Sequence, residues 1–209
     1  MSQELPNKLT PFSRQELLDA LYAAWTSVVG SPCADVDSVR LVAAQISFEI
    51  GNGTSCHNWN LGNVKAIAGG KYDWQYFACG EVINGKCVQY SPDNPAQKPY
   101  CCFRAFDTFR AGIADHLLLL TANKNFARAW PAVTECNPAQ FCALLKQARY
   151  FTADLAVYSA GVCSIFREMQ TLRPKAPTPN AGVAADLTSR DLLLIVDPEE
   201  DVARWSETE

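Results

Sequence analysis

The sequence predicts an α+β protein that is mainly α, in which a helical domain carries a small β-hairpin lobe. Apolar residues recur at helical spacing in several stretches. In the first stretch they are Leu17, Leu18, Leu21, Trp25 and Val28. The dipeptide Asn84-Gly85 separates two short runs of strand-forming residues, which is typical of a tight β-hairpin. These two patterns together predict helices with one small strand-containing lobe.

Size and composition indicate one globular domain with an extension. The chain has 209 residues, of which 48% are hydrophobic. Its net charge of -4 argues against a nucleic-acid partner, because such partners are held through phosphate contacts. No apolar run approaches the roughly 20 residues of a membrane span. The first residues lack a basic region followed by an apolar one, so we expect no ordinary signal peptide.

The chain is rich in cysteine, with nine in all. This number indicates that some of them pair in an oxidising compartment such as the periplasm, and the odd count leaves at least one outside an internal pair. No Cys-x-x-Cys motif occurs, and the two histidines, His57 and His116, lie far apart in the sequence. We therefore expect no zinc site and no cofactor.

The sequence divides into three parts. Residues 1–12 form a polar lead, residues 13–172 form the domain, and residues 173–209 read as a proline-rich linker with an acidic C-terminal extension. Ser13 and Glu16 form a capping-box pattern at the start of the first helix, and Gly30 should end that helix. Asp35 or Asp37 should cap the second helix.

The later elements have their own start signals. Asp107 should cap a helix with an apolar stripe, Asn137 followed by Pro138 should start the next, and Thr152 should cap the last long helix.

The tight turn at Asn84-Gly85 places Ile83 opposite Lys86 and Cys79 opposite Tyr90. Cys79 and Cys87 are then not directly opposite, so we do not expect a bridge between them. Gln75–Cys79, residues 82–88 and Tyr100–Phe106 should be strands.

Glu49 is the candidate for acid chemistry. It ends an apolar helix, and Gly51 is a natural stop signal after it. A carboxyl in the last helical turn faces the negative end of the helix dipole, and Phe48 and Ile50 flank it with apolar surface. Both effects disfavour the carboxylate, so we expect a raised pKa for Glu49. An acid that is protonated near neutral pH can protonate a leaving group, as in glycosidic bond cleavage.

The stretch around Glu49 resembles a known catalytic motif. Glu49, Gly51–Gly53, Ser55, Asn58 and Asn60–Lys65 resemble the motif of the glucosaminidase-like branch of the lysozyme superfamily. This branch is glycoside hydrolase family 73, the flagellar and autolysin-type peptidoglycan hydrolases. Its pattern is a helix-ending Glu, a loop of small residues, and Asn-(Leu/Phe)-(Phe/Gly)-Gly-(Ile/Val)-Lys. This sequence has one residue fewer between its Asn and its Lys.

Three later stretches extend the resemblance over about residues 15 to 172. Phe103–His116 is similar to the family's aromatic-basic strand and following helix. Phe126–Trp130 is similar to its Tyr-Ala-x-Ala segment. Tyr150–Tyr158 is similar to its Tyr-Ala-Thr-Asp-Pro-x-Tyr motif, with a leucine where proline is usual. The resemblance implies a lysozyme-like helical domain with a small β-hairpin lobe beside the active-site cleft.

The resemblance also implies a substrate and site residues. The substrate would be the β-1,4-linked glycan strand of peptidoglycan, with Glu49 protonating the departing oxygen. Glu81 on the hairpin is the candidate second carboxylate, with Asp73 as the other candidate. Tyr150 would line the cleft and support the transition state. Asn60 would hydrogen-bond an acetamido sugar.

Aromatic residues near the hairpin are candidates for stacking on sugars. They are Tyr72, Trp74 and Tyr76, although a strand that alternates its two faces cannot present all of them equally. His116 lies within an apolar helical pattern, so we interpret it as a structural histidine rather than a catalyst.

The sequence leaves the mechanism open. A second carboxylate can act on the sugar cation directly or through water, the substrate's N-acetyl group can attack, or a neighbouring hydroxyl can attack to give the anhydro product of a lytic transglycosylase. The bond cut, N-acetylglucosaminyl or N-acetylmuramyl, is also open, so a muramidase is an alternative. A different class is a glycan-binding lysozyme-like module without catalysis. A third is a cysteine hydrolase using Cys56 or Cys102 with a histidine.

The route to the substrate follows from the missing signal peptide. A wall-degrading enzyme made in the cytoplasm must reach the periplasm or cell wall by a secretion machine or with a phage. We therefore expect a secreted antibacterial effector or a phage-associated lysin. A delivery-machine partner, or an immunity protein that plugs the cleft, would accompany such an effector.

Overall fold

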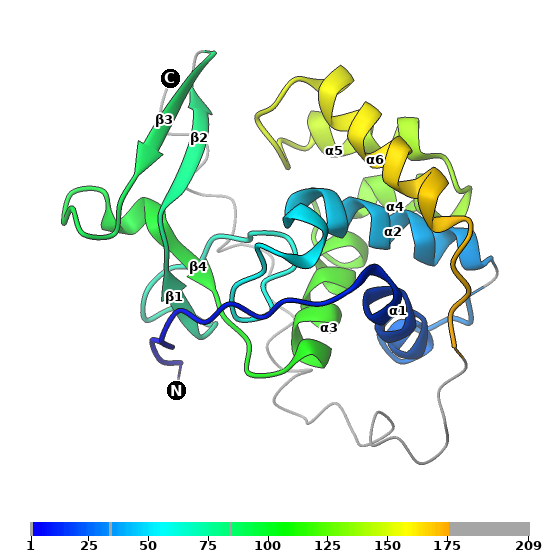
Figure 1. Ribbon diagram of the computed structural model, residues 1–209, viewed down its shortest axis with the longest axis horizontal. Helices are drawn as coiled ribbons and strands as arrows, with labels where there is room; N and C mark the ends of the chain where they lie inside the picture. Colours follow the sequence, from blue (N-terminus) through cyan, green and yellow to red (C-terminus); the bar gives the residue numbers. More distant parts are fainter. Residues whose placement is uncertain (1, 34, 84, 176–209) are drawn as a thin grey trace.

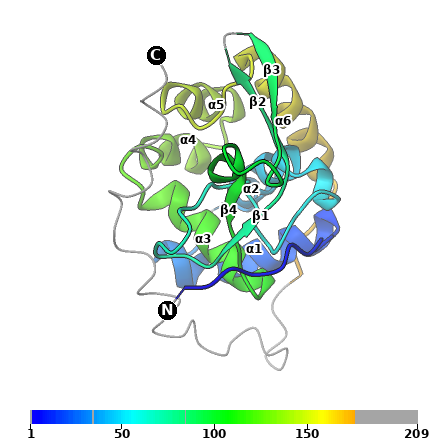
Figure 2. The ribbon, with the colours of Figure 1, turned by 90° about the vertical axis from the view of Figure 1, so that its left-hand side faces the viewer.

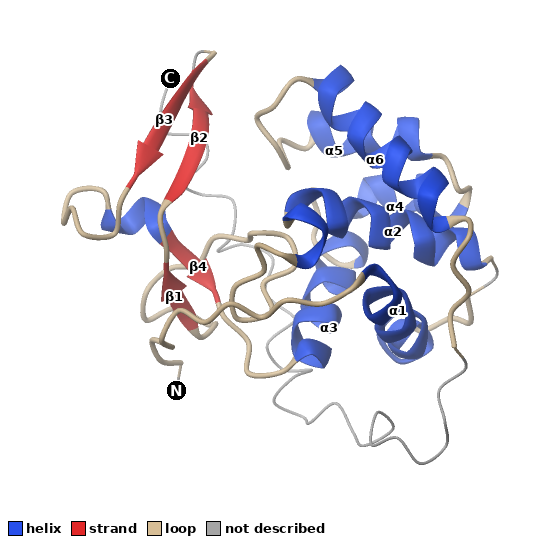
Figure 3. Cartoon of the chain, viewed as in Figure 1, coloured by secondary structure: helices blue, strands red, loops and turns tan. Residues whose placement is uncertain are grey.

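The α-helices occupy one side of the molecule and the strands the other (Figure 1, Figure 3). The computed structural model describes residues 2–33, 35–83 and 85–175. The helices are α1 (Arg14–Val29), α2 (Val36–Glu49), α3 (Phe109–Thr121), α4 (Trp130–Thr134), α5 (Pro138–Gln147) and α6 (Leu155–Met169). The strands are β1 (Trp74–Tyr76), β2 (Cys79–Ile83), β3 (Lys86–Tyr90) and β4 (Cys102–Arg104). The fold class is therefore α+β and mainly α, as predicted.

Helix α2 is the centre of the helical side. It packs against α1, α4 and α6, and from Ser38 to Ser47 every one of its residues is buried. Such burial requires neighbours on nearly every side of the helix. The burial of α2 fixes the place where it ends, at Glu49, because its neighbours hold it along its whole length.

Most helix ends follow the expected signals. Ser13 and Glu16 form the capping box of α1, and Gly30 ends α1 in the left-handed conformation with φ 78°. Asp35 caps α2 by accepting a hydrogen bond from the backbone N–H of Asp37. Asn137 caps α5, with Pro138 in its first turn.

Two predicted caps are wrong by one or two residues. Helix α3 is capped by Thr108 rather than Asp107, because the Thr108 hydroxyl accepts from the backbone N–H of Ala111 at 3.2 Å. Helix α6 is capped by Asp154 rather than Thr152, because the Asp154 carboxylate accepts from two backbone N–H groups. In both cases several potential caps stand close together, and tertiary contacts decide which of them begins the helix.

The β lobe consists of two small antiparallel sheets. Strand β1 pairs with β4, and β2 pairs with β3. The hairpin register places Ile83 opposite Lys86 and Cys79 opposite Tyr90, as predicted; Asn84 itself lies outside the described residues. The predicted strand Gln75–Cys79 is divided instead, since it belongs partly to β1 and partly to β2. The chain thus passes from one sheet to the other at this point. In Figure 2 the strands face the viewer and the helices lie behind them.

The N-terminal lead packs on the β lobe. The Trp74 N–H donates to the Gln3 carbonyl at 3.0 Å, and the Leu5 N–H donates to the Trp74 carbonyl at 2.8 Å. Figure 1 shows this segment running from α1 to β1. Most of the predicted linker and acidic extension, residues 176–209, lies outside the described residues. Among the residues that are described, no helix is both long and apolar enough to cross a membrane.

Two helical glycines allow close packing around α2 and the loop that follows it. A Cβ atom on Gly112 in α3 would lie 2.1 Å from the Trp59 carbonyl oxygen. A Cβ atom on Gly161 in α6 would lie 2.1 Å from the ring of Phe48, the residue before Glu49. Side chains at these positions would push α3 and α6 away from the segments that build the pocket described below.

Gly112→Ala should therefore lower the free energy of unfolding by about 1–3 kcal/mol, although alanine is the better helix former. The obstacle is a backbone carbonyl, which cannot rotate away. Gly161→Ala should cost less, because its obstacle is a half-buried phenylalanine ring that can turn. Urea unfolding of both variants measures the difference. A stabilised Gly112→Ala variant would contradict this account of the α3 contact.

Candidate active site

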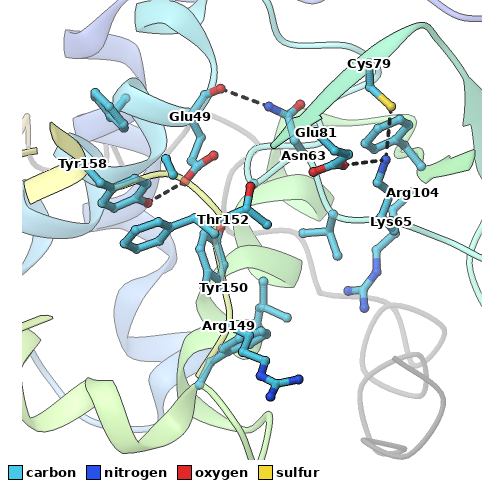
Figure 4. A pocket seen from close by; sticks show the side chains of 18 of the residues that line it. Glu49, Asn63, Lys65, Cys79, Glu81, Arg104, Arg149, Tyr150, Thr152 and Tyr158 are labelled. Atoms are coloured by element: carbon cyan, nitrogen blue, oxygen red, sulfur yellow. Dashed lines mark hydrogen bonds and ion pairs between the residues drawn. The ribbon is translucent and has the colours of Figure 1, made fainter. Parts of the chain in front are cut away.

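A cavity lies between the end of α2, the β2–β3 hairpin and the segment before α6. Its volume is about 860 Å³. Glu49, Asn63, Glu81, Tyr150 and Tyr158 all line it. Figure 4 shows Glu49 and Tyr158 on one side of this pocket and Glu81 with Lys65 on the other. The structure thus brings together residues that lie more than one hundred positions apart in the sequence.

Glu49 is half-buried at the pocket wall. Burial raises the pKa of its carboxyl to about 7, and hydrogen bonds from Tyr158 and Gln45 oppose the rise. The direction agrees with the expectation from the sequence, with burial as the leading cause. The backbone carbonyl of Glu49, left without a helical partner at the end of α2, accepts from the Asn63 side-chain amide at 3.0 Å.

A buried polar network holds the Glu49 side chain. The Tyr158 hydroxyl donates to Glu49 Oε1 at 2.5 Å. Gln45, one turn earlier on α2, directs its amide nitrogen toward Glu49 Oε1 at 3.5 Å, the Tyr150 hydroxyl at 3.1 Å and the Tyr158 hydroxyl at 3.2 Å. The Gln45 carbonyl oxygen faces His116 Nε2 at 2.8 Å. One glutamine therefore joins four side chains around the pocket.

His116 is a neutral member of this network. Because the Gln45 oxygen can only accept, His116 Nε2 must carry the proton. Burial, and after it the nearby Arg104 charge, lower the pKa of His116 to about 3. The ring is 1% exposed and does not line the pocket. These contacts support the interpretation of His116 as a structural histidine.

The network also decides which oxygen of Glu49 carries its acidic proton. Glu49 Oε1 accepts from Tyr158, so the proton of the neutral carboxyl belongs on Oε2. When the proton leaves, Tyr158 and Gln45 stabilise the carboxylate that remains, since both lower the pKa of Glu49. The arrangement suits a group that must give up a proton near neutral pH.

Glu81 comes to the same pocket from strand β2. It forms an ion pair with Lys65, whose Nζ lies 3.2 Å from Glu81 Oε1. Lys65 also donates to the Tyr100 carbonyl at 2.6 Å and to Cys79 Sγ at 3.3 Å. Figure 4 shows the Glu49 and Glu81 carboxyl groups on opposite sides of the pocket. The two carboxyl groups thus occupy different environments, one buried in a network of uncharged groups and one beside a cation.

Tyr150 lines the pocket next to Glu49. Its hydroxyl accepts from Gln45, and its ring packs edge-on against Phe126 with the ring centroids 5.2 Å apart. Burial raises the pKa of Tyr150 well above its usual value, and the Glu49 charge adds to the rise. The phenol is therefore neutral at any pH near 7, with its proton available to a bound molecule.

Four residues that the sequence placed at the site as candidates for substrate binding or as the second carboxylate do not line this pocket. Asn60 is 1% exposed, and its side chain bonds to the backbone of Val64 and to the carbonyl of Arg104. Asp73 accepts from the Gln3 N–H at 2.8 Å. Trp74 and Tyr76 lie in β1, and neither lines the pocket. Asn60 is not free to bind a substrate, because its amide closes the loop before Lys65. These bonds use both the amide nitrogen and the amide oxygen of Asn60.

Sequence reasoning did not identify three residues of this site. Tyr158 and Gln45 contact Glu49 directly, and Asn63 binds its carbonyl. Gln45 had a recognisable signal, since it is a polar residue four positions before Glu49 in an otherwise apolar helix, hence on the same face. Tyr158 is the last residue of the Tyr150–Tyr158 stretch that resembles a family motif, but its contact with Glu49 depends on how α6 packs against α2.

A cysteine nucleophile does not fit the geometry. Burial raises the pKa of Cys56 to about 11, so this thiol is protonated. The adjacent His57 instead faces Asn7, with Nδ1 and Oδ1 2.6 Å apart, and stacks on Phe77. Cys102 is buried and does not line the pocket. Within the described part of the chain, no group of three or more acidic, histidine or cysteine residues is arranged to hold a metal ion.

Comparison with known proteins places the fold. No protein-family model and no curated protein sequence matches the chain. Among solved structures, it is similar to a mutant of a peptidoglycan hydrolase from Sphingomonas sp. A1, with a TM-score of 0.54, 20% identity, and coverage of 73% of this chain and 92% of the other. A C-terminally truncated glycoside hydrolase domain of FlgJ from Salmonella typhimurium also matches, with a TM-score of 0.48, 21% identity, and coverage of 77% of this chain and 100% of the other. The first match shows a shared fold, consistent with the resemblance found in the sequence.

The raised pKa of Glu49 predicts a pH-dependent gap in stability between the wild type and Glu49→Gln. Between about pH 4.5, the ordinary value, and about 7, the folded wild type binds more protons than the unfolded chain. The wild type therefore loses stability as the pH rises through this window, and the variant does not. The stability of Glu49→Gln relative to the wild type should grow by roughly 3 kcal/mol across it.

Urea unfolding of both proteins at a series of pH values measures this gap. His116, whose lowered pKa acts in the opposite direction, is present in both proteins and cancels in the difference. Glu135→Gln, at an exposed position, is the matched control and should show a flat difference. A gap that stays constant or shrinks with rising pH would mean that Glu49 is not held protonated by the fold.

Proposed function

We propose that this chain cleaves the β-1,4-linked glycan strand of peptidoglycan, with Glu49 as the general acid. The observation that carries the proposal is a half-buried carboxyl with a pKa of about 7 on the wall of a large pocket. Glycosidic cleavage requires an acid that is still protonated near neutral pH. The shared fold with a peptidoglycan hydrolase supports the choice of substrate.

In this mechanism Glu49 Oε2 gives its proton to the glycosidic oxygen as the bond breaks. The hydrogen bonds from Tyr158 and Gln45 then hold the Glu49 carboxylate. Burial alone would make the acid too weak to release its proton, and these two donors bring its pKa back toward the working pH. Tyr158 acts here through Glu49, so it is a positioning residue.

Glu81 is our candidate for the second carboxylate. It faces the pocket from the other side, where Lys65 pairs with it. A carboxylate there can position a water or meet the developing positive charge on the sugar directly. Attack by the substrate's own N-acetyl group or by a neighbouring hydroxyl remains the alternative route, and the latter would give an anhydro product. Tyr150 supports the transition state as a neutral hydrogen-bond donor.

The sequence resemblance favours cleavage of the N-acetylglucosaminyl bond, and the muramidase reaction is the alternative. Reaching peptidoglycan requires that the protein act in the periplasm or cell wall. Delivery as an antibacterial effector or a phage-associated lysin, with a delivery-machine or immunity partner, stays a prediction of the sequence.

Glu49→Gln should reduce release of soluble fragments from purified peptidoglycan by about 10²–10⁴-fold, because the amide cannot protonate the leaving oxygen. Glu135→Gln should keep full activity. Mass spectrometry of the products gives the reducing-end sugar, which names the bond, and an anhydro end would name the transglycosylase route.

Glu81→Gln should lose activity if the second carboxylate acts, and should keep it if the substrate's N-acetyl group or a hydroxyl attacks.

Equal activity of the wild type and Glu49→Gln would remove Glu49 as the acid. If neither protein cleaves and both retain binding to insoluble peptidoglycan, the chain is a glycan-binding module rather than an enzyme. Circular dichroism of each variant shows whether it is folded, which separates lost chemistry from lost structure.

A further inference from the structure

Six of the nine cysteines lie in three pairs. The pairs are Cys33 with Cys136, Cys79 with Cys101, and Cys142 with Cys163. All nine are thiols in this structure. The members of each pair come from different elements, so the fold and not the local sequence brings them together. From the sequence we expected only that some cysteines pair, without naming the partners.

Cys79 and Cys101 meet at the base of the β lobe. The Phe77 N–H donates to the Cys101 carbonyl at 3.2 Å, which holds the two segments side by side. The Cys79 thiol approaches the Tyr100 carbonyl at 3.5 Å, directly beside Cys101. The Cys101 thiol contacts both the side chain and the backbone of Cys79. The Cys79 and Cys101 side chains therefore lie next to one another in the folded chain.

The other two pairs each share a neighbour. Ser159 Oγ lies 3.9 Å from Cys163 Sγ and also contacts Cys142, across the packed faces of α5 and α6. Asp35 accepts from the Cys33 thiol at 2.9 Å through its carbonyl, and its side chain contacts Cys136. Cys136 also lies 3.6 Å from Ser38 Oγ, in the first turn of α2.

Each pair has a sulfur that an external reagent can approach. Cys79, Cys163 and both members of the Cys33–Cys136 pair are half-buried, whereas Cys101 and Cys142 are buried behind their partners. Lys65 Nζ lies 3.3 Å from Cys79 Sγ. The remaining cysteines have other surroundings: Cys56 contacts Thr10, Cys87 contacts Gln89, and Cys102 contacts Tyr76.

We propose that Cys33–Cys136, Cys79–Cys101 and Cys142–Cys163 are disulfide sites that close when the folded chain meets a disulfide oxidant. In each pair one thiolate attacks a sulfur of the oxidant, forms a mixed disulfide and releases the oxidant's first thiol. The second thiolate then attacks the protein sulfur of that mixed disulfide and displaces the oxidant's second thiol. Two protein thiols and one oxidant disulfide give one protein disulfide and two oxidant thiols, so two electrons pass to the oxidant.

The three bridges would tie together the parts that form the pocket. Cys79–Cys101 fastens the start of the β2–β3 hairpin beside β4, next to the ion pair of Lys65 with Glu81. Cys142–Cys163 fastens α5 to α6, which carries Tyr158. Cys33–Cys136 fastens the start of α2 to the turn after α4. Such cross-links raise stability chiefly by restricting the unfolded chain.

The test uses the full chain, folded, in a buffer of oxidised and reduced glutathione. After acid quenching and unfolding, free thiols are alkylated with N-ethylmaleimide, and the digest is sequenced by mass spectrometry without reduction. We expect three cross-linked peptide pairs with these connections, and alkylated Cys56, Cys87 and Cys102. The urea midpoint of unfolding should fall when dithiothreitol is added.

Single variants separate the three bridges. Cys79→Ser should leave Cys101 alkylated and the other two bridges intact, and Cys142→Ser should do the same for Cys163. Cys87→Ser is the matched control and should change neither the map nor the midpoint. Any of the six cysteines found bridged to a different partner, or still alkylated at equilibrium in the wild type, would overturn the proposal. Oxidation of the unfolded chain should give mixed pairings, which shows that the fold selects the partners.

Discussion

The burial of the Glu49 carboxyl at the end of α2 is the constraint on which the site depends. A carboxyl at an exposed helix end would ionise well below neutral pH. Here α1, α4 and α6 enclose α2, so its last residue, Glu49, reaches the pocket from the packed helical side of the protein. Close approach of α6, made possible by Gly161 against Phe48, completes the apolar surround. The helical side thus fixes both the position of the acid and its protonation.

The polar network around Glu49 shows how the fold accommodates a buried acid. Gln45 joins His116, Tyr150, Tyr158 and Glu49, and all four titratable groups are neutral when the acid is protonated. An uncharged network costs much less to bury than an ion pair would. On the opposite side of the pocket the neighbour of the carboxyl is charged, because Glu81 lies beside the Lys65 ammonium. The two carboxyl groups of one pocket thus lie in different surroundings, as separate acid and base roles require.

Features that depend on residues near each other in the sequence were predicted correctly. Features that depend on tertiary contacts were not. The capping box at Ser13, the end of α1 at Gly30 and the hairpin register all follow from nearby residues, and all were predicted. Glu49 was identified because its position at a helix end is visible in the sequence. Asn60 was assigned to substrate, yet its amide closes its own loop. Tyr158 was missed, since only the packing of α6 on α2 brings its hydroxyl to Glu49.

The most direct test of this account is the titration of the Glu49 carboxyl itself. Wild-type protein carrying ¹³C-labelled glutamate side chains is followed by NMR across the pH range, and Glu49→Gln identifies the Glu49 signal by its disappearance. The account predicts a midpoint near pH 7 for this carboxyl, as burial beside Tyr158 and Gln45 requires. A midpoint near the ordinary value of 4.5 would contradict it, because Glu49 would then be ionised at neutral pH and unable to act as an acid.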